Sequence, residues 1–231
     1  MSRLAQAIRI ELTAAADPAK APAMQAYMKS AMPYLGVTAV PLEKICRSIF
    51  RELSYPASSP WQRDVLAVWN GARFREERYA AIALTGIKAA QAFQRGDALG
   101  MYEQIIVTGA WWDYIDPIAT GRLGHLLRNE PAAMKRAMRT WSKGADIWKR
   151  RSAILCQIKA KQATDLALLY ACIEPSLDSK EFFLRKAIGW ALREYAWTDA
   201  SEVRKYVKAH EARLSGLSRR EALKNIGANL P

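Results

Sequence analysis

The segment WWDYID at residues 111–116 brings two tryptophans and two carboxylates together. If it begins a helix, Trp112 and Asp116 lie four residues apart and share one face, whereas Trp111 lies on another face that can point into the core. A carboxylate and an aromatic π face on one side of a helix can together stabilise a cation. The ordinary alternative is that Asp113 caps the helix and both tryptophans are packing residues, which is the better explanation for an isolated pattern of this kind.

A second segment, WKRRSAIL at residues 148–155, contains two adjacent arginines. Arg150 and Arg151 each carry a planar guanidinium that can hold a phosphate or a carboxylate through two hydrogen bonds. A solvated, charged helix face explains them equally well. The residues alone leave both interpretations open.

A third segment, FFLRKAIGWALREY at residues 182–195, places one aromatic residue between two cations. Lys186, Trp190 and Arg193 fall on one helix face because they are separated by four and three residues. That arrangement suits contact with a nucleic acid backbone and with a base or sugar. A core tryptophan with peripheral charges is an equally good interpretation, in which Gly189 simply allows close helix packing.

Several kinds of active site are missing from the sequence. It contains no glycine-rich phosphate-binding loop and no HxE…PCxxC pattern of zinc deaminases. His125 and His210 belong to no recognisable nucleophile arrangement, so we expect them at the surface or in packing. Three cysteines without CxxC spacing predict no metal site and no disulfide framework, and we expect no cofactor.

The composition indicates a folded and strongly basic chain. Its 231 residues are 51% hydrophobic and carry 35 Lys+Arg against 22 Asp+Glu, a formal net charge of +13. A sizeable core can be buried, and the excess positive charge predicts a polyanionic partner such as nucleic acid. Reduced thiols, the lack of a secretory signal and the lack of an apolar run of about 18 residues predict a cytoplasmic protein. If the polyanionic partner is DNA, we expect the protein to be nucleoid-associated when bound to it.

Helical periodicity recurs along the whole chain, and the alternation typical of strands is almost absent, which predicts an all-α fold. Pro60 and Pro131 are expected at first helical positions, and Ser218 with Glu221 forms the pattern of a capping box. Stacked antiparallel helix pairs, an α-solenoid, accommodate so many short helices better than one bundle does. We expect a single domain over residues 1–231, curved, with Lys and Arg on its concave face. The predicted helices span residues 3–16, 18–31, 40–54, 60–72, 75–93, 98–108, 111–128, 131–142, 145–161, 163–174, 180–197, 199–209 and 218–229.

The three segments resemble those of the AlkD-type family of DNA alkylation-repair glycosylases. The resemblance also covers AYMK at residues 26–29 and SRREALK at residues 218–224, so it spans almost the whole chain in the same order. It implies HEAT-like repeats and excision of N3- and N7-alkylated purines from double-stranded DNA. The sequence departs from the family where Ile115 replaces the usual valine, and it matches only loosely at about residues 55–100.

The resemblance also implies roles for individual residues. Asp116 is the implied catalytic carboxylate, and Trp112 and Trp190 are implied to flank the lesion nucleotide. Arg151 matches the family's DNA-contacting arginine, and Tyr27 matches its N-terminal aromatic residue. With the two cations beside Trp190, the predicted DNA-binding set is Arg151, Tyr27, Lys186 and Arg193.

This chemistry is compatible with a sparse site. An alkylated purine is cationic and already an activated leaving group, so no general acid is needed, and one carboxylate near C1′ can stabilise the oxocarbenium-like sugar and orient water. We expect a monofunctional glycosylase of base excision repair, without lyase activity because no lysine is an evident nucleophile, and with poor release of uracil. Two alternatives are a non-catalytic binder of distorted or branched DNA and a protein-binding helical scaffold, for which a charge of +13 would be unusual. No dimerisation element is evident, so we expect a monomer.

Overall fold

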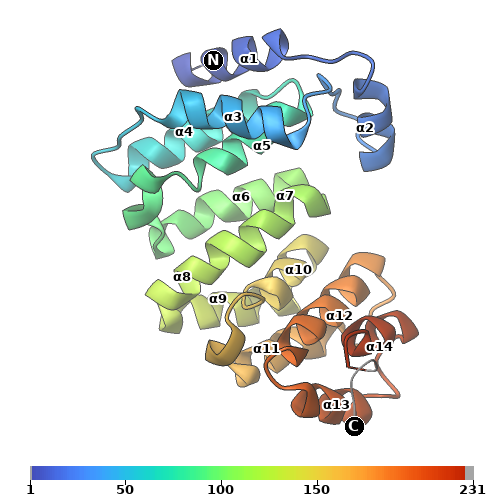
Figure 1. The fold of residues 1–231 in the computed structure, drawn as a ribbon. Coiled ribbons are helices and arrows are strands. Elements are labelled where there is room, and N and C mark those ends of the chain that lie inside the picture. The colour runs from blue at the N-terminus through green and yellow to red at the C-terminus, as the bar shows by residue number, and fades with distance from the viewer. Residues whose placement is uncertain (1, 227–231) are drawn as a thin grey trace. The chain divides into compact units, whose positions relative to one another are not determined.

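A computed structural model describes residues 2–226, and helices account for all regular secondary structure in that part of the chain (Figure 1). The predicted all-α fold is therefore confirmed. Residues up to Met101 pack as one compact unit and residues from Tyr102 onward as a second. The assignment of residues 1–231 to a single domain stays a prediction. Within residues 2–226, no helix combines the length and the apolar character that crossing a membrane requires.

The first unit is built around large apolar side chains. Its elements are α1 (Arg3–Ala14), α2 (Ala21–Met28), α3 (Ala39–Phe50), α4 (Ser58–Gly71), α5 (Arg75–Leu84) and the 3-10 segments η1 (Lys88–Phe93) and η2 (Gly96–Ala98). Trp61, Trp69 and Leu84 are almost completely buried. The indole N–H of Trp61 donates to the carbonyl of Leu84 at 3.3 Å, which joins α4 to the end of α5.

A buried carboxylate shapes the loop that leads into α3. Glu76 has no exposed surface and accepts the backbone N–H groups of three consecutive residues, Leu35, Gly36 and Val37, at 2.9 to 3.1 Å. Gly36 has a φ of +86°, and a Cβ there would lie 2.0 Å from the carbonyl oxygen of Asp17. Only glycine fits this turn, because the conformation is left-handed and there is no room for a side chain.

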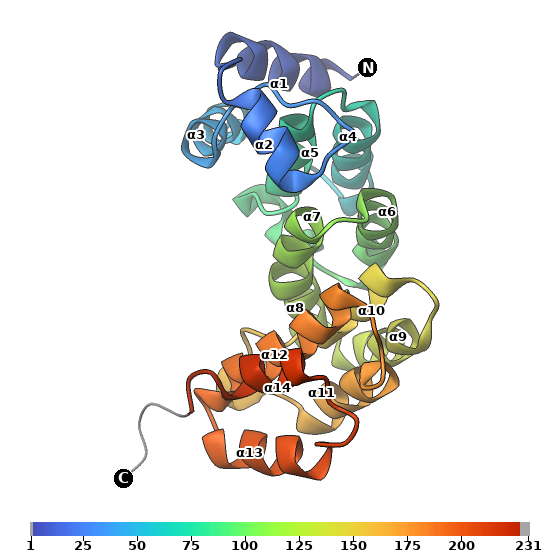
Figure 2. The ribbon, with the colours of Figure 1, turned by 90° about the vertical axis from the view of Figure 1, so that its right-hand side faces the viewer.

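The second unit stacks its helices along the rest of the chain. Its elements are α6 (Leu99–Gly109), which begins in the first unit, α7 (Trp112–Pro117), the π-helix η3 (Ile118–Leu123), α8 (Gly124–Asn129), α9 (Pro131–Lys143), α10 (Ile147–Leu155), η4 (Lys161–Ala163), α11 (Leu166–Ile173), η5 (Glu174–Ser176), α12 (Phe182–Ala196), α13 (Ala200–Ala209) and α14 (Gly216–Leu223). Helices α12 and α14 lie side by side (Figures 1 and 2). At Gly189 they approach so closely that a Cβ would lie 2.5 Å from the Cβ of Glu221. The close packing considered for Gly189 from the sequence is therefore present.

Two predicted helices are interrupted in the structure. The helix expected over residues 75–93 ends at Leu84, and the chain continues as a separate 3-10 segment from Lys88. The helix expected over residues 111–128 contains the π-helical stretch Ile118–Leu123. Apolar spacing predicts that a segment is helical, but a change in the hydrogen-bonding pattern from i→i+4 to i→i+5 leaves that spacing almost unchanged.

Two of the predicted helix starts were wrong. The cap of α14 is Ser215, whose hydroxyl accepts the N–H of Ser218 at 3.0 Å, so Ser218 lies inside the helix and the predicted capping box is not formed. The hydroxyl of Ser218 donates instead to a backbone carbonyl of α12. Helix α4 begins at Ser58, which makes Pro60 its third residue, whereas Pro131 is the first residue of α9 as predicted.

Candidate active site

Asp116 and Arg151 form an ion pair through two parallel hydrogen bonds. Nε and Nη2 of Arg151 each donate to one carboxylate oxygen of Asp116 at 2.8 Å. The arginine side chain is 6% exposed and the aspartate side chain 17%. The two charge-assisted bonds fix the plane of the carboxylate and leave part of it open to solvent. Of the two partners considered for Arg151, the structure shows the carboxylate, and the phosphate contact stays a prediction.

The same guanidinium connects three helices. Nη1 of Arg151 donates to the carbonyl of Phe183 at 2.7 Å, so α10 is tied both to Asp116 on α7 and to the beginning of α12. The start of α10 is itself fixed by Asp146, whose carboxylate accepts the N–H groups of Trp148 and Lys149 at 2.9 and 2.8 Å. Arg151 is therefore held one turn after a well-capped helix start.

The backbone changes its helical form directly after Asp116. Pro117 follows and has no N–H to donate, and the helix continues in the π form over Ile118–Leu123. The hydroxyl of Thr120 donates to the carbonyl of Asp116 at 2.9 Å, which satisfies an acceptor at this junction. Short π-helical stretches are frequent at functional sites. Here the stretch begins two residues after the carboxylate of Asp116.

A cluster of three aromatic rings packs beside the ion pair. The ring centroids of Trp111, Trp148 and Phe183 lie 4.9 to 6.1 Å from one another, and Cζ of Arg151 lies 6.0 Å from the Phe183 ring. Trp111 is thus a packing residue, one of the possibilities raised from its spacing. The sequence gives no sign that Trp148 and Phe183 join it, because nothing local shows that these distant segments meet.

The other residues of WWDYID divide between the two sequence interpretations. Trp112 is the first residue of α7 and is half-buried, and it lies four residues before Asp116 as predicted. Asp113 is not the cap of this helix: Trp111 occupies the cap position without a side-chain hydrogen bond, and Asp113 lies in the first turn. A carboxylate in the first turn interacts favourably with the positive end of the helix, so Asp113 still has a structural explanation.

Glu221 pairs with both cations of the aromatic-basic face on α12, which consists of Lys186, Trp190 and Arg193. Nζ of Lys186 lies 3.0 Å from one oxygen of Glu221, and Arg193 binds the other. The hydrogen bond from Lys186 is the main reason why the pKa of Glu221 is lowered. The third member of the face, Trp190, is half-buried and donates its indole N–H to Glu194 at 3.3 Å. This face is therefore less positive than the sequence of residues 182–195 alone suggested, because Glu221 on α14 compensates both cations.

The neighbouring Arg150 has a structural partner. Its Nε and Nη2 both lie within hydrogen-bonding distance of the Ser176 hydroxyl, at 3.1 and 2.8 Å, and Nη2 also donates to the carbonyl of Pro175 at 2.6 Å. Arg150 thus attaches α10 to the 3-10 segment that follows α11. Neither the phosphate contact nor the solvated face considered for it is needed to explain this side chain.

Tyr27 lies in the first unit and is 77% exposed. It borders a cavity of about 380 Å³. The cavity is lined by apolar and aromatic side chains, namely Met24, Tyr27, Met28, Tyr34, Val37, Ala39, Leu42 and Tyr79. The role of Tyr27 in contacting DNA stays a prediction.

The two histidines take the unremarkable positions expected from the sequence. His125 is exposed, and His210 packs against the ring of Tyr206 with centroids 4.3 Å apart. Within residues 2–226, no three His, Cys, Asp or Glu side chains are grouped so that they could hold a metal ion.

Comparison with known proteins identifies the family. The family model described as DNA alkylation repair enzyme matches residues 8–226. The chain belongs to this DNA alkylation repair enzyme family. A solved structure described as a predicted DNA alkylation repair enzyme from Enterococcus faecalis is similar, with 25% sequence identity and a TM-score of 0.75 over 93% of this chain and 98% of that one. No curated protein matches the sequence.

Membership of the DNA alkylation repair enzyme family confirms two coarse predictions. The packed, all-helical chain agrees with the α-solenoid of HEAT-like repeats, and the family supports a role in DNA repair with DNA as the partner. The curvature and the basic concave face stay predictions.

Proposed function

We propose that the protein is a monofunctional DNA glycosylase that hydrolyses the N-glycosidic bond of cationic N3- and N7-alkylated purines in duplex DNA. The observation that carries this proposal is the Asp116 carboxylate, held in a fixed plane by Arg151 and 17% open to solvent. Each carboxylate oxygen has two lone pairs, and Arg151 uses one on each. The remaining two can face a developing positive charge or accept a hydrogen bond from water.

The reaction needs only one carboxylate. As the C1′–N bond breaks, its electron pair neutralises the cationic purine, which leaves without being protonated, and positive charge develops on the deoxyribose. Asp116 stabilises that charge electrostatically, an effect that is stronger in a partly shielded site than in bulk water. A water oxygen then bonds to C1′, and its proton passes to Asp116 or to solvent. The products are the free base and an abasic site.

The aromatic residues assist the carboxylate. Trp112 shares the α7 face with Asp116, and in the proposed complex Trp112 and Trp190 pack against the lesion nucleotide. Each π face attracts a cation by about 0.5–2 kcal/mol, depending on desolvation. Arg151 is a positioning residue in this scheme, since its two bonds orient Asp116. Tyr27 and the two cations of α12 contact the DNA backbone.

A non-catalytic binder of distorted or branched DNA is the second candidate, and one observation favours it. Arg151 neutralises Asp116, so this carboxylate would repel DNA phosphates less than its charge alone suggests. The ion pair alone therefore suits both a catalyst and a binder.

Product analysis separates the two candidates. Methylated duplex DNA is incubated with the wild-type protein or Asp116→Asn, and released bases are quantified by mass spectrometry together with the integrity of the strand. The proposal predicts free 3-methyladenine or 7-methylguanine from wild type, an uncleaved abasic strand, and strong loss of release in the variant with binding retained. Tight binding to branched DNA without base release by wild type would favour the binder, and strand cleavage at the abasic site would contradict the monofunctional mechanism.

A further inference from the structure

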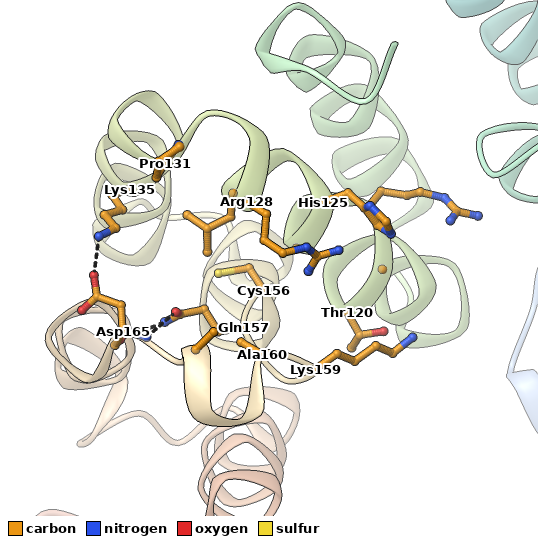
Figure 3. Close-up of a pocket in the computed structure, with 15 residues that line it drawn as sticks. Thr120, His125, Arg128, Pro131, Lys135, Cys156, Gln157, Lys159, Ala160 and Asp165 are labelled. Atoms are coloured by element: carbon orange, nitrogen blue, oxygen red, sulfur yellow. Dashed lines mark hydrogen bonds and ion pairs between the residues drawn. The ribbon is translucent and has the colours of Figure 1, made fainter. Parts of the chain in front are cut away.

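A basic cavity of about 560 Å³ lies in the second unit (Figure 3), and neither Asp116 nor Arg151 is among the residues that line it. Its walls come from the π-helix η3, from α8, from the start of α9 and from the chain between α10 and α11. None of its side chains belongs to the predicted DNA-binding set. The titratable and charged groups that line it are Arg122, His125, Arg128, Lys135, Cys156, Lys159 and Asp165.

The single carboxylate of the cavity is already occupied. Asp165 lies 2.7 Å from Nζ of Lys135 and also accepts the N–H of Leu168 as the cap of α11. Arg128 and Lys159 are exposed, and neither makes an ion pair with any residue between positions 2 and 226. Figure 3 shows the Lys135–Asp165 pair at one end of the cavity, and Arg128, His125 and Lys159 away from it. Between positions 2 and 226, the charges of Arg128 and Lys159 therefore have no carboxylate partner.

His125 reports the electrostatic potential at this end of the cavity. Its pKa is lowered first by partial burial and then by the nearby charges of Arg128, Arg122 and Lys159. Burial also lowers the pKa of Arg122. The thiol of Cys156 is buried, and its pKa is raised well above the ordinary value, so it adds no negative charge. The cations Arg122, Arg128 and Lys159 thus all disfavour a positive charge on His125, and a bound anion would reduce the repulsion among these groups.

Gly124 shapes the floor of the cavity. A Cβ at this position would lie 3.0 Å from the carbonyl oxygen of Cys156 and 3.6 Å from Nη1 of Arg128. Because the glycine has no side chain, α8 approaches the end of α10 closely and the Arg128 guanidinium lies back over its own helix.

We propose that this cavity binds a phosphate group of the DNA backbone, a site separate from the one around Asp116. The inference rests on the proposed function for the identity of the polyanion. Asp116 and Arg128 are twelve residues apart along α7, η3 and α8, which corresponds to at most about 18 Å at the α-helical rise of 1.5 Å per residue, because the π-helical residues rise less. A duplex running along these elements with its lesion at Asp116 places a phosphate near the cavity within roughly five base-pair steps, at 3.4 Å per step.

Salt-dependent binding tests the site without requiring any chemistry. The Arg128→Gln/Lys159→Gln variant is compared with wild type on an undamaged duplex over a range of salt concentrations, with Lys143→Gln/Lys208→Gln as a control that removes two other exposed lysines. Because all four side chains are exposed, neither variant removes core contacts. In the cavity variant, we expect the slope of log K against log salt to become shallower by about 1 and the affinity to fall by roughly ten-fold. The control should keep the wild-type slope. Equal slopes for the cavity variant and wild type would overturn the proposal.

Methylphosphonate scanning locates the phosphate that the cavity contacts. Single neutral linkages are placed three to seven nucleotides from a lesion analogue on either strand. Wild type should lose affinity at one or two positions, and the cavity variant should be insensitive there. Uniform sensitivity of both proteins would contradict a discrete phosphate site.

NMR of the His125 imidazole identifies the source of the phosphate. The pKa of His125 should rise when the undamaged duplex binds, because a phosphate offsets the neighbouring cations. A rise with inorganic phosphate but none with the duplex would assign the cavity to a free phosphate ion instead. Failure of wild type to release alkylated bases would contradict the proposed function but leave these binding results unaffected.

Discussion

The Arg151–Asp116 pair predicts a specific pattern of stabilities. In Arg151→Met the side chain keeps most of its apolar length but loses three hydrogen bonds, and the Asp116 carboxylate stays behind without its counter-ion. Breaking a buried pair by removing one partner costs about 3–5 kcal/mol. Since the Asp116 side chain is 17% exposed and can be partly hydrated, we expect the lower end, about 3 kcal/mol.

Urea denaturation followed by circular dichroism measures this loss, and thermal melting provides a second readout. For a chain of this size, 1 kcal/mol shifts Tm by about 2–4 °C, so Arg151→Met should melt roughly 6–12 °C below wild type. The double variant Asp116→Leu/Arg151→Met should recover most of the loss, because no unpaired charge remains; only the Phe183 carbonyl still lacks its donor, which costs about 1 kcal/mol. A loss below about 1 kcal/mol in the single variant, or a double variant as unstable as the two single changes added together, would refute this reasoning.

Three further predictions concern the surrounding structure. In Gly189→Ala, the new Cβ would lie 2.5 Å from Glu221 and must push α14 away, so calorimetry should show a destabilisation of about 1–3 kcal/mol, and an unchanged Tm would contradict the close packing. The hydrogen bond from Lys186 lowers the pKa of Glu221 in the folded protein, so ionised Glu221 stabilises the fold at pH values above its ordinary pKa of 4.5, and this contribution is lost as the pH falls through the lowered pKa. The Tm of Glu221→Gln should therefore fall less than the Tm of wild type between pH 6 and pH 3. Parallel curves of Tm against pH would oppose this prediction. Burial raises the pKa of Cys46 and of Cys172 to about 12, so iodoacetamide at pH 8 should label these thiols only after unfolding, as counted by mass spectrometry, and rapid labelling of the native protein would contradict their burial.

Features of the site that depend on neighbouring residues could be predicted from the sequence. Trp112 and Asp116 share a face because their separation is four residues, and helical spacing holds within one element. The partner of Asp116 could not be found in this way, because Arg151 lies 35 residues further along the chain. From the sequence, the guanidinium of Arg151 was equally suited to a phosphate and to a carboxylate.

The fold shows the same division between local and distant information. Apolar periodicity was sufficient for an all-α assignment and for most helix positions, because one buried stripe defines each helix. It did not reveal that Ser215 rather than Ser218 caps α14, since both serines are followed by helix-compatible residues. Nor did it show that Glu221 pairs with Lys186 and Arg193, which requires knowing that α14 packs on α12.

The central claim is that Asp116, and not its neighbour Asp113, is the catalytic carboxylate. The most direct measurement is the single-turnover rate of base release from methylated duplex DNA by Asp116→Asn and Asp113→Asn, compared with wild type at saturating protein. Losing one preorganised electrostatic group costs about 10²–10³ in rate, so Asp116→Asn should be slower by that factor while Asp113→Asn stays close to wild type. Wild-type rates in Asp116→Asn, or a collapse confined to Asp113→Asn, would contradict the account.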